Sequence, residues 1–229
     1  MSRVLDLLSA AHGQCRLTFV SATQLKLSPF NGNNLSIGGL PRLVPDAGVT
    51  VSNSGLSAST VYYVYAYLAS GVMTLELSTT GHTASGGIEV KTGDTSRTLV
   101  GMVLTNASSQ FQDGESVIGV LSFFGRRRKV ARAKFTANRT LNLNASASEV
   151  NAELRVPFLS WADESVCQSI AGSWAVTGGS TLANCYPSID GDTAGQRQAP
   201  STGIASQHGF SCADERLVSE GSHYGTMMG

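Results

Sequence analysis

Charged residues are scarce in this chain of 229 residues. Asp, Glu, Lys and Arg make up 14% of it, whereas an ordinary soluble domain contains roughly 25%. Acidic and basic residues cancel to a formal net charge of zero, so no overall field steers the chain toward nucleic acid. We expect no nucleic-acid partner, and we expect the abundant Ser, Thr, Asn and Gly to form strands and turns.

Long apolar runs are missing as well. No stretch approaches the roughly 18 residues of a membrane-spanning helix. The first residues also lack the apolar segment of a cleaved signal peptide. We therefore expect no insertion into a membrane.

Cysteine is rare, and its positions are Cys15, Cys167, Cys185 and Cys212. No pair has CxxC spacing, and none lies at zinc-finger distance from a histidine. Buried thiols that pack like small apolar side chains are the favoured interpretation. A disulfide between Cys167 and Cys185 remains open if that region forms a hairpin, although a reducing cytoplasm would oppose it.

Catalytic motifs are also absent from the sequence, which has no HExxH, no GxSxG and no clear Ser/His/Asp grouping. Residues 190–195 resemble the beginning of a calcium loop. However, Ala194 occupies an acidic position and Ser201 stands where the chelating Glu belongs. An ordinary Asp-Gly turn is therefore the better interpretation. We expect no enzymatic activity, no metal site and no cofactor.

Short strands with alternating side chains dominate what is present. Residues 61–68 are the clearest case, because both faces are apolar or aromatic and both should be covered. A short Gly-containing link to residues 72–78 predicts a hairpin. The Gly- and Pro-rich residues 37–44 are expected to form a loop with brief extended pieces. Further strands are predicted at residues 17–19, 25–27, 88–91, 98–105 and 116–124. Strands this frequent predict an all-β fold of the sandwich or barrel type.

The N-terminus carries the only helical pattern. Its apolar residues have the i, i+3, i+4, i+7 spacing of one helix face, and they are Val4, Leu7, Leu8 and Ala11. A helix this short is only marginally stable alone. Its apolar stripe should therefore dock on its own domain or on a neighbouring subunit.

A change of composition at Gly125 predicts a domain boundary. Seven basic residues and no acidic one lie between Arg126 and Arg139. Alternation with apolar residues at 130–136 predicts a strand with one charged face. This face would either contact phosphate or lipopolysaccharide, or form a solvated edge or a salt bridge to a partner subunit. We therefore predict an N-terminal β domain at residues 1–125 and a C-terminal β-sandwich at residues 126–229.

The predicted second domain again consists of strands. They are expected at residues 140–144, 149–161, 166–176 and 182–189, followed by a final pair at 216–219 and 222–228. Residues 191–209 are polar and carry no periodicity, so we expect an exposed loop.

Five residues of this domain are candidates for binding a sugar receptor. The rings of Trp161, Trp174 and Tyr186 would stack on a sugar face. The carboxylates of Asp190 and Asp192 would accept hydrogen bonds from its hydroxyl groups. In a strand-rich domain such aromatic residues more often belong to the core, so both interpretations remain open.

Residues 61–129 carry the sequences YYVYAY, SGVMTLE, STTGH, EVKTGDTSRTLVGMV and SFFGRR in this order. This block resembles one that recurs in tail fibres and other virion structural proteins of tailed bacteriophages. The C-terminal segments RVPFLSWADESV, SIDGD and LVSEGSHYGTMMG are similar to that family too. These motifs are structural signatures and name no ligand.

The resemblance implies a homotrimeric virion protein that is assembled in the host cytoplasm and binds other tail or capsid proteins. Its expected role is a tail fibre or fibre-like appendage that helps the particle attach to the host, with surface polysaccharide as a candidate receptor. The N-terminal stripe would then anchor it, and the C-terminal domain would be distal. The alternative is a capsid-decorating protein, head fibre or adaptor without a receptor role.

Overall fold

The computed structural model describes residues 13–138, 147–162, 164–175, 185–193 and 207–229. The regular elements of these segments are strands, apart from one short 3₁₀ turn, η1 (Ala152–Leu154). This confirms the all-β prediction. The predicted N-terminal helix with Val4, Leu7, Leu8 and Ala11 lies outside the described residues, as does the predicted strand at 140–144. The chain divides into two compact units, Met1–Val130 and Ala131–Gly229.

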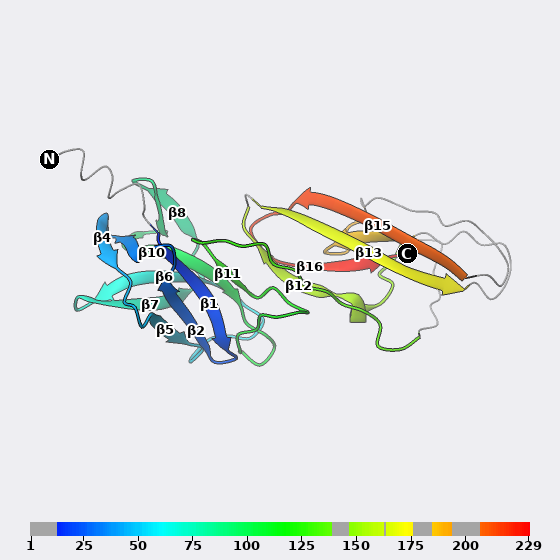
Figure 1. Cartoon of the computed structure of the whole chain (residues 1–229), viewed down its shortest axis with the longest axis horizontal. Coiled ribbons are helices and arrows are strands. Elements are labelled where there is room, and N and C mark those ends of the chain that lie inside the picture. The colour runs from blue at the N-terminus through cyan, green and yellow to red at the C-terminus, as the bar shows by residue number, and fades with distance from the viewer. Residues whose placement is uncertain (1–12, 139–146, 163, 176–184, 194–206) are drawn as a thin grey trace. The chain divides into compact units, whose positions relative to one another are not determined.

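The largest sheet of the first unit is built around two long strands, β6 (Val61–Ala69) and β10 (Asp94–Leu104). The strand β7 (Val72–Ser78) extends the sheet beyond β6 and confirms the predicted hairpin. Two strands pair with the other edge of β10, namely β9 (Ile88–Lys91) and the short β11 (Val120–Ser122). The strand β8 (His82–Ser85) pairs in turn with β9. Figure 1 shows these strands side by side in the order β7, β6, β10.

The first unit contains two smaller sheets. One consists of β1 (Cys15–Ser21), β2 (Gln24–Pro29) and β5 (Val49–Ser52). The other is a hairpin of β3 (Asn34–Ile37) and β4 (Leu40–Leu43). Its turn contains Gly38 and Gly39 with φ of 59° and 75°, a backbone conformation that glycine adopts readily. The sequence predicted a loop with brief extended pieces at residues 37–44 because of these glycines. The glycines instead form the turn of a hairpin.

Apolar side chains from these sheets bury one another in one core. The strand β6 contributes Tyr62, Val64 and Ala66 to it. The strands β1 and β2 contribute Cys15, Leu17, Leu25 and Leu27. On the opposite face of β6, Tyr65 is also fully buried, and its hydroxyl donates to the carbonyl oxygen of Thr80 at 2.8 Å. At this position both faces of β6 are covered.

The second unit combines a small sheet with a long two-stranded ribbon. In the sheet, β16 (Gly221–Met228) lies between β12 (Val156–Ser160) and β14 (Tyr186–Ile189). In the ribbon, β13 (Ser165–Ala175) and β15 (Gln207–Leu217) pair without interruption along their whole length (Figure 1). The predicted pairing of the last two segments is therefore wrong. The last strand pairs with β12 and β14, and its sequence neighbour β15 pairs with β13.

The core of the second unit lies between the ribbon and the small sheet. Gln168 of β13 donates its side-chain amide to the carbonyl oxygen of Thr226 in β16 at 2.7 Å. This bond ties the two layers together. The buried apolar residues of this unit include Phe158, Leu159, Trp161, Tyr186, Ile189, Cys212, Met227 and Met228.

The basic segment forms no strand. Residues 126–138 contain no regular element, so the predicted strand at 130–136 is wrong. Exposed and half-buried side chains do alternate from Ala131 to Phe135, but none of the strands in the described segments pairs with these residues. The division between the units falls after Val130, not after Gly125. Lys129 thus belongs to the first unit, where its ammonium group lies 2.5 Å from Asp113 Oδ2.

Candidate functional site

The aromatic residues predicted to stack on a sugar lie in the core. Trp161 follows β12 and Tyr186 begins β14, and only 2% and 1% of these residues is exposed. Neither ring presents a face to a ligand, so the stacking prediction is wrong for both and the core interpretation holds. Trp174 lies in β13 opposite His208, and its side chain is outside the described part of the structure.

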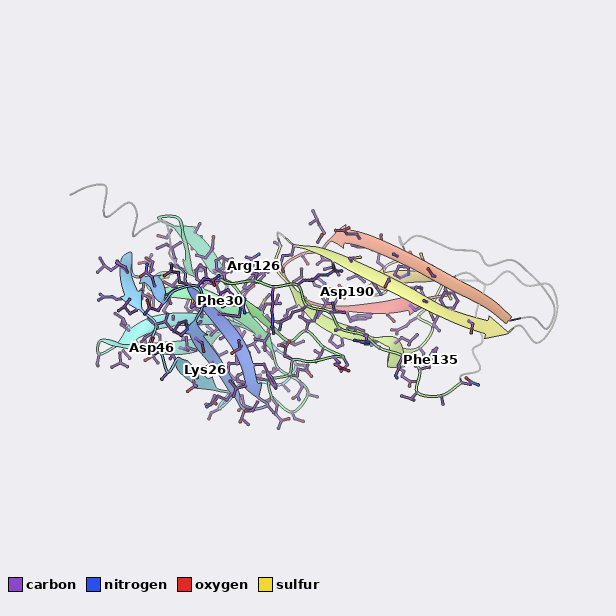
Figure 2. All side chains as sticks on the ribbon, in the orientation of Figure 1. Lys26, Phe30, Asp46, Arg126, Phe135 and Asp190 are labelled. Carbon is purple, nitrogen blue, oxygen red and sulfur yellow. The ribbon has the colours of Figure 1, made fainter. Side chains whose placement is uncertain are left out.

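Asp190 and Asp192 come together at the turn after β14. Asp190 has a φ of 56° and Gly191 a φ of 76°, as Asp and Gly tolerate in turns. The predicted Asp-Gly turn is therefore confirmed. The two aspartate side chains are 46% and 50% exposed. Both carboxylates thus reach solvent beside this turn, and Asp190 is labelled in Figure 2.

Both oxygens of Asp190 are already engaged within the second unit. The backbone N–H of Tyr224 donates to Oδ1 at 2.9 Å. The other oxygen, Oδ2, lies 2.6 Å from Nδ1 of His223. Asp190 therefore ties the turn to β16, and this structural role limits what it can offer to a ligand.

Asp190 and His223 are joined by Ser219, a combination that sequence reasoning missed. The Ser219 hydroxyl lies 3.5 Å from Nε2 of His223, but the Ser219 carbonyl oxygen lies closer, at 2.9 Å. A carbonyl oxygen only accepts hydrogen bonds. The carbonyl oxygen is thus the nearer partner of Nε2, and the hydroxyl lies at the outer limit of hydrogen-bond distance, longer than the contact that a serine hydrolase requires between its nucleophile and its base. The arrangement stabilises the connection between β15 and β16.

Arginine side chains complete the surface around the turn. Arg216 Nη1 lies 3.0 Å from Asp192 Oδ2. The guanidinium group of Arg155 lies over the ring of Tyr224 at 4.7 Å from its centroid. Sequence reasoning singled out neither arginine nor Tyr224, because nothing in their local pattern places them beside residues 190–192.

Glu149 holds Arg155 in this position. The Arg155 guanidinium donates to both oxygens of Glu149, at 2.8 and 2.6 Å. Hydrogen bonds from Arg155 lower the pKa of Glu149, partial burial opposes the shift, and the Thr226 hydroxyl adds to the lowering. The carboxylate is thus stabilised in its charged form as part of the scaffold.

A second charged group crosses the outer face of the large sheet in the first unit. Glu76 of β7 pairs with Lys91 of β9 and with Arg97 of β10. Arg97 also lies over the Tyr67 ring at 4.5 Å. Partial burial raises the pKa of Glu76, but hydrogen bonds from Lys91 and Arg97 outweigh it and the pKa is lowered. These paired charges connect three strands.

The third charged feature is a shallow hollow in the first unit, which we call the basic hollow. Its volume is about 280 Å³, and its lining consists of Asp113, Gly114, Ile118, Arg127, Arg128, Lys129 and Val130. Lys129 is paired with Asp113. Arg127 and Arg128 are exposed, and neither forms an ion pair with any residue in the described segments. In the sequence, this site is marked by the run of basic residues after Gly125, the same change of composition that predicted the domain boundary.

The described segments contain no cluster of three or more His, Cys, Asp or Glu side chains that could hold a metal ion. No helix within the same segments is long and apolar enough to cross a bilayer.

All four cysteines are described, and they form no disulfide. Cys167 is exposed and Cys185 is buried, so the disulfide that the sequence left open between them is not formed.

Comparison with known proteins adds no family assignment. No protein-family model matches the chain, and no curated protein and no solved structure gives a significant match.

Proposed function

We propose that this chain is a virion structural protein of a tailed bacteriophage, a tail fibre or fibre-like appendage that contributes to host attachment. The observation that carries the proposal is the place of the resembling block in the fold. Its YYVYAY sequence lies in β6 and its SRTLVGMV sequence in β10, the paired central strands of the large sheet. The motif residues are thus scaffold residues, which favours a shared architecture over a shared catalytic site.

The described charges support a scaffold role. Glu76 connects strands in the first unit, and Asp190 connects a turn to β16 in the second. We further infer that each unit is a β-sandwich. In the first unit, the sheet of β1, β2 and β5 shares its core with the large sheet.

We propose a homotrimer as the assembled form. Several large apolar side chains are exposed on the single chain, and they include Leu43 (70%), Val72 (67%) and Leu217 (71%). Burying such side chains between subunits is favourable. Light scattering should give three times the 23.9 kDa of one chain. A mass near that of one chain at micromolar concentration would contradict the trimer.

The position on the particle can be tested by immunogold electron microscopy. Antibodies raised against the recombinant protein should label the tails of purified particles of the encoding phage. Label on the head would instead support the capsid-decorating or head-fibre alternative. Particles without any label, with a labelled positive control, would contradict a virion role.

Attachment requires a separate experiment. The purified protein should compete with the phage for adsorption to host cells and should bind purified host polysaccharide. Tail labelling without competition or polysaccharide binding would favour the adaptor alternative.

The anchoring role of Val4, Leu7, Leu8 and Ala11 is also a proposal. The buried cluster of described residues in the first unit starts at Cys15. Deleting residues 1–12 should therefore leave the unfolding transition unchanged and abolish incorporation into particles. Normal incorporation of the truncated chain in a complementation assay would argue against an anchor.

A further inference from the structure

Two neighbouring arginines face the basic hollow, and neither has an acidic partner within the described part of the chain. Arg127 and Arg128 both line it and both are exposed. Asp113 is the acid among the lining residues, and its carboxylate is paired with Lys129. These two charges cancel, so the hollow retains the charge of two guanidinium groups. An anion is the ligand that this charge favours.

The hollow is held in shape by hydrogen bonds. Asp113 Oδ1 accepts from the backbone N–H groups of Gly119 at 3.1 Å and Val120 at 3.3 Å. Asp113 Oδ2 accepts from Lys129, which also donates to the carbonyl oxygen of Val120 at 2.6 Å. These bonds fasten the segment that carries the arginines to the neighbouring loop. A ligand therefore meets a backbone whose position is fixed, and the arginine side chains are the part that binding must order.

The lining residues favour one kind of anion. A guanidinium group presents paired N–H donors that match the oxygens of a phosphate. Ile118 and Val130 add an apolar wall, which suits the C–H groups of a sugar ring. A volume of about 280 Å³ is close to the lower limit of roughly 300 Å³ for small-ligand pockets. It is large enough for one small group.

We propose that the basic hollow binds a phosphate group carried on a sugar. The lining residues include no aromatic ring, and single-stranded nucleic acids are usually bound by stacking their bases on such rings. The hollow would bind a sugar phosphate whether or not the chain belongs to a virion.

Equilibrium dialysis of the full-length protein against radiolabelled glucose 6-phosphate tests the assignment. Saturable binding of one molecule per chain is expected, and unlabelled glucose should not compete. Inorganic phosphate should compete more weakly than unlabelled glucose 6-phosphate. The double variant R127Q/R128Q should bind about tenfold more weakly or worse, because charge-assisted hydrogen bonds are lost. Its melting temperature should not change, since neither arginine is paired with a described residue.

A matched variant controls for overall charge. R42Q/R132Q removes the same charge at two exposed positions outside the hollow and should bind like the wild type. Equal losses in both double variants, or no saturable binding by the wild type, would overturn the site. Inorganic phosphate competing as well as glucose 6-phosphate would overturn recognition of the sugar. Tighter binding of a single-stranded oligonucleotide than of the sugar phosphate would overturn the ligand class.

Discussion

Single carboxylates act as ties between distant segments of this protein. Glu76 joins β7 to β9 and β10 through Lys91 and Arg97. Asp190 joins its turn to Tyr224 of β16. In a chain with so few charged residues, these side chains thus satisfy one another within each unit. The contribution of the Glu76 tie should depend on pH.

Glu76→Gln should destabilise the first unit by roughly 1 kcal/mol at neutral pH, as expected for partly exposed ion pairs. The folded-state pKa of Glu76 is lowered. Its stabilisation is therefore present above the ordinary carboxyl pKa and is lost as the pH falls through the folded-state pKa. Urea unfolding followed by circular dichroism should show the stabilities of the wild type and the variant converging as the pH falls below about 4.3, the ordinary pKa of a glutamate side chain.

Glu115→Gln is the control for this prediction. Glu115 is exposed and forms no ion pair with the described residues. Its replacement should leave stability unchanged at every pH. If Glu76→Gln also left stability unchanged at every pH, the ion pairs of Glu76 would not contribute to the stability of the first unit.

The cysteines should differ sharply in reactivity. Burial raises the pKa of Cys15 to about 12 and that of Cys185 to about 11. Cys212 is buried as well, whereas Cys167 is exposed. Because the thiolate is the reactive form, we expect one fast-reacting thiol when the native protein is titrated with an aromatic disulfide reagent at mildly alkaline pH. Cys167→Ser should remove the fast phase and Cys15→Ser should preserve it, while rapid reaction of several native thiols would contradict this burial pattern.

At the scale of elements, one glycine permits three strands to approach. A Cβ atom at Gly101 of β10 would lie 2.4 Å from Leu17 Cδ2 of β1 and 2.5 Å from the Leu121 carbonyl oxygen of β11. The backbone oxygen cannot move away without breaking the pairing of β10 with β11. The sequence alone shows only a glycine within a strand pattern, which is unfavourable until the neighbours are known.

Gly101→Ala should therefore lower the free energy of unfolding by about 2 kcal/mol, as overpacking does in well-packed cores. Gly81→Ala is the matched control, because a Cβ there meets no atom within 4 Å. Thermal denaturation should show a clear loss for the first variant and little change for the second. Similar melting temperatures for the two variants would contradict the close approach at Gly101.

At the scale of the whole molecule, each unit has its own buried residues. The core of the first unit includes Leu25 and Val64, and that of the second includes Trp161 and Tyr186. Residues 1–130 should therefore fold as an isolated fragment. We expect cooperative thermal unfolding within a few degrees of the corresponding transition in the full chain, at matched protein concentration. A fragment without a cooperative transition would show that the first unit needs the rest of the chain.

The sequence by itself determined the fold class and the clearest hairpin. The alternation in residues 61–68 and 72–78 and the short glycine link predict β6, β7 and their pairing, because side-chain period and turn chemistry are local properties. The Asp190-Gly191 turn was predictable for the same reason. The local residue pattern did not predict β5, which has only four residues. For the segment of β3 and β4 it predicted a loop with brief extended pieces, whereas the structure has a hairpin.

Only the tertiary structure decided which residues share a surface. Trp161 and Tyr186 could have stacked on a ligand, but packing between layers buries them. Asp190 meets His223 across 33 residues of sequence, and β15 pairs with β13 although β16 follows it directly. Likewise, the basic run predicted charge, but the bond between Lys129 and Asp113 places Arg127 and Arg128 at a hollow. Strand pairing and burial depend on contacts between distant segments, which a local pattern of residues does not specify.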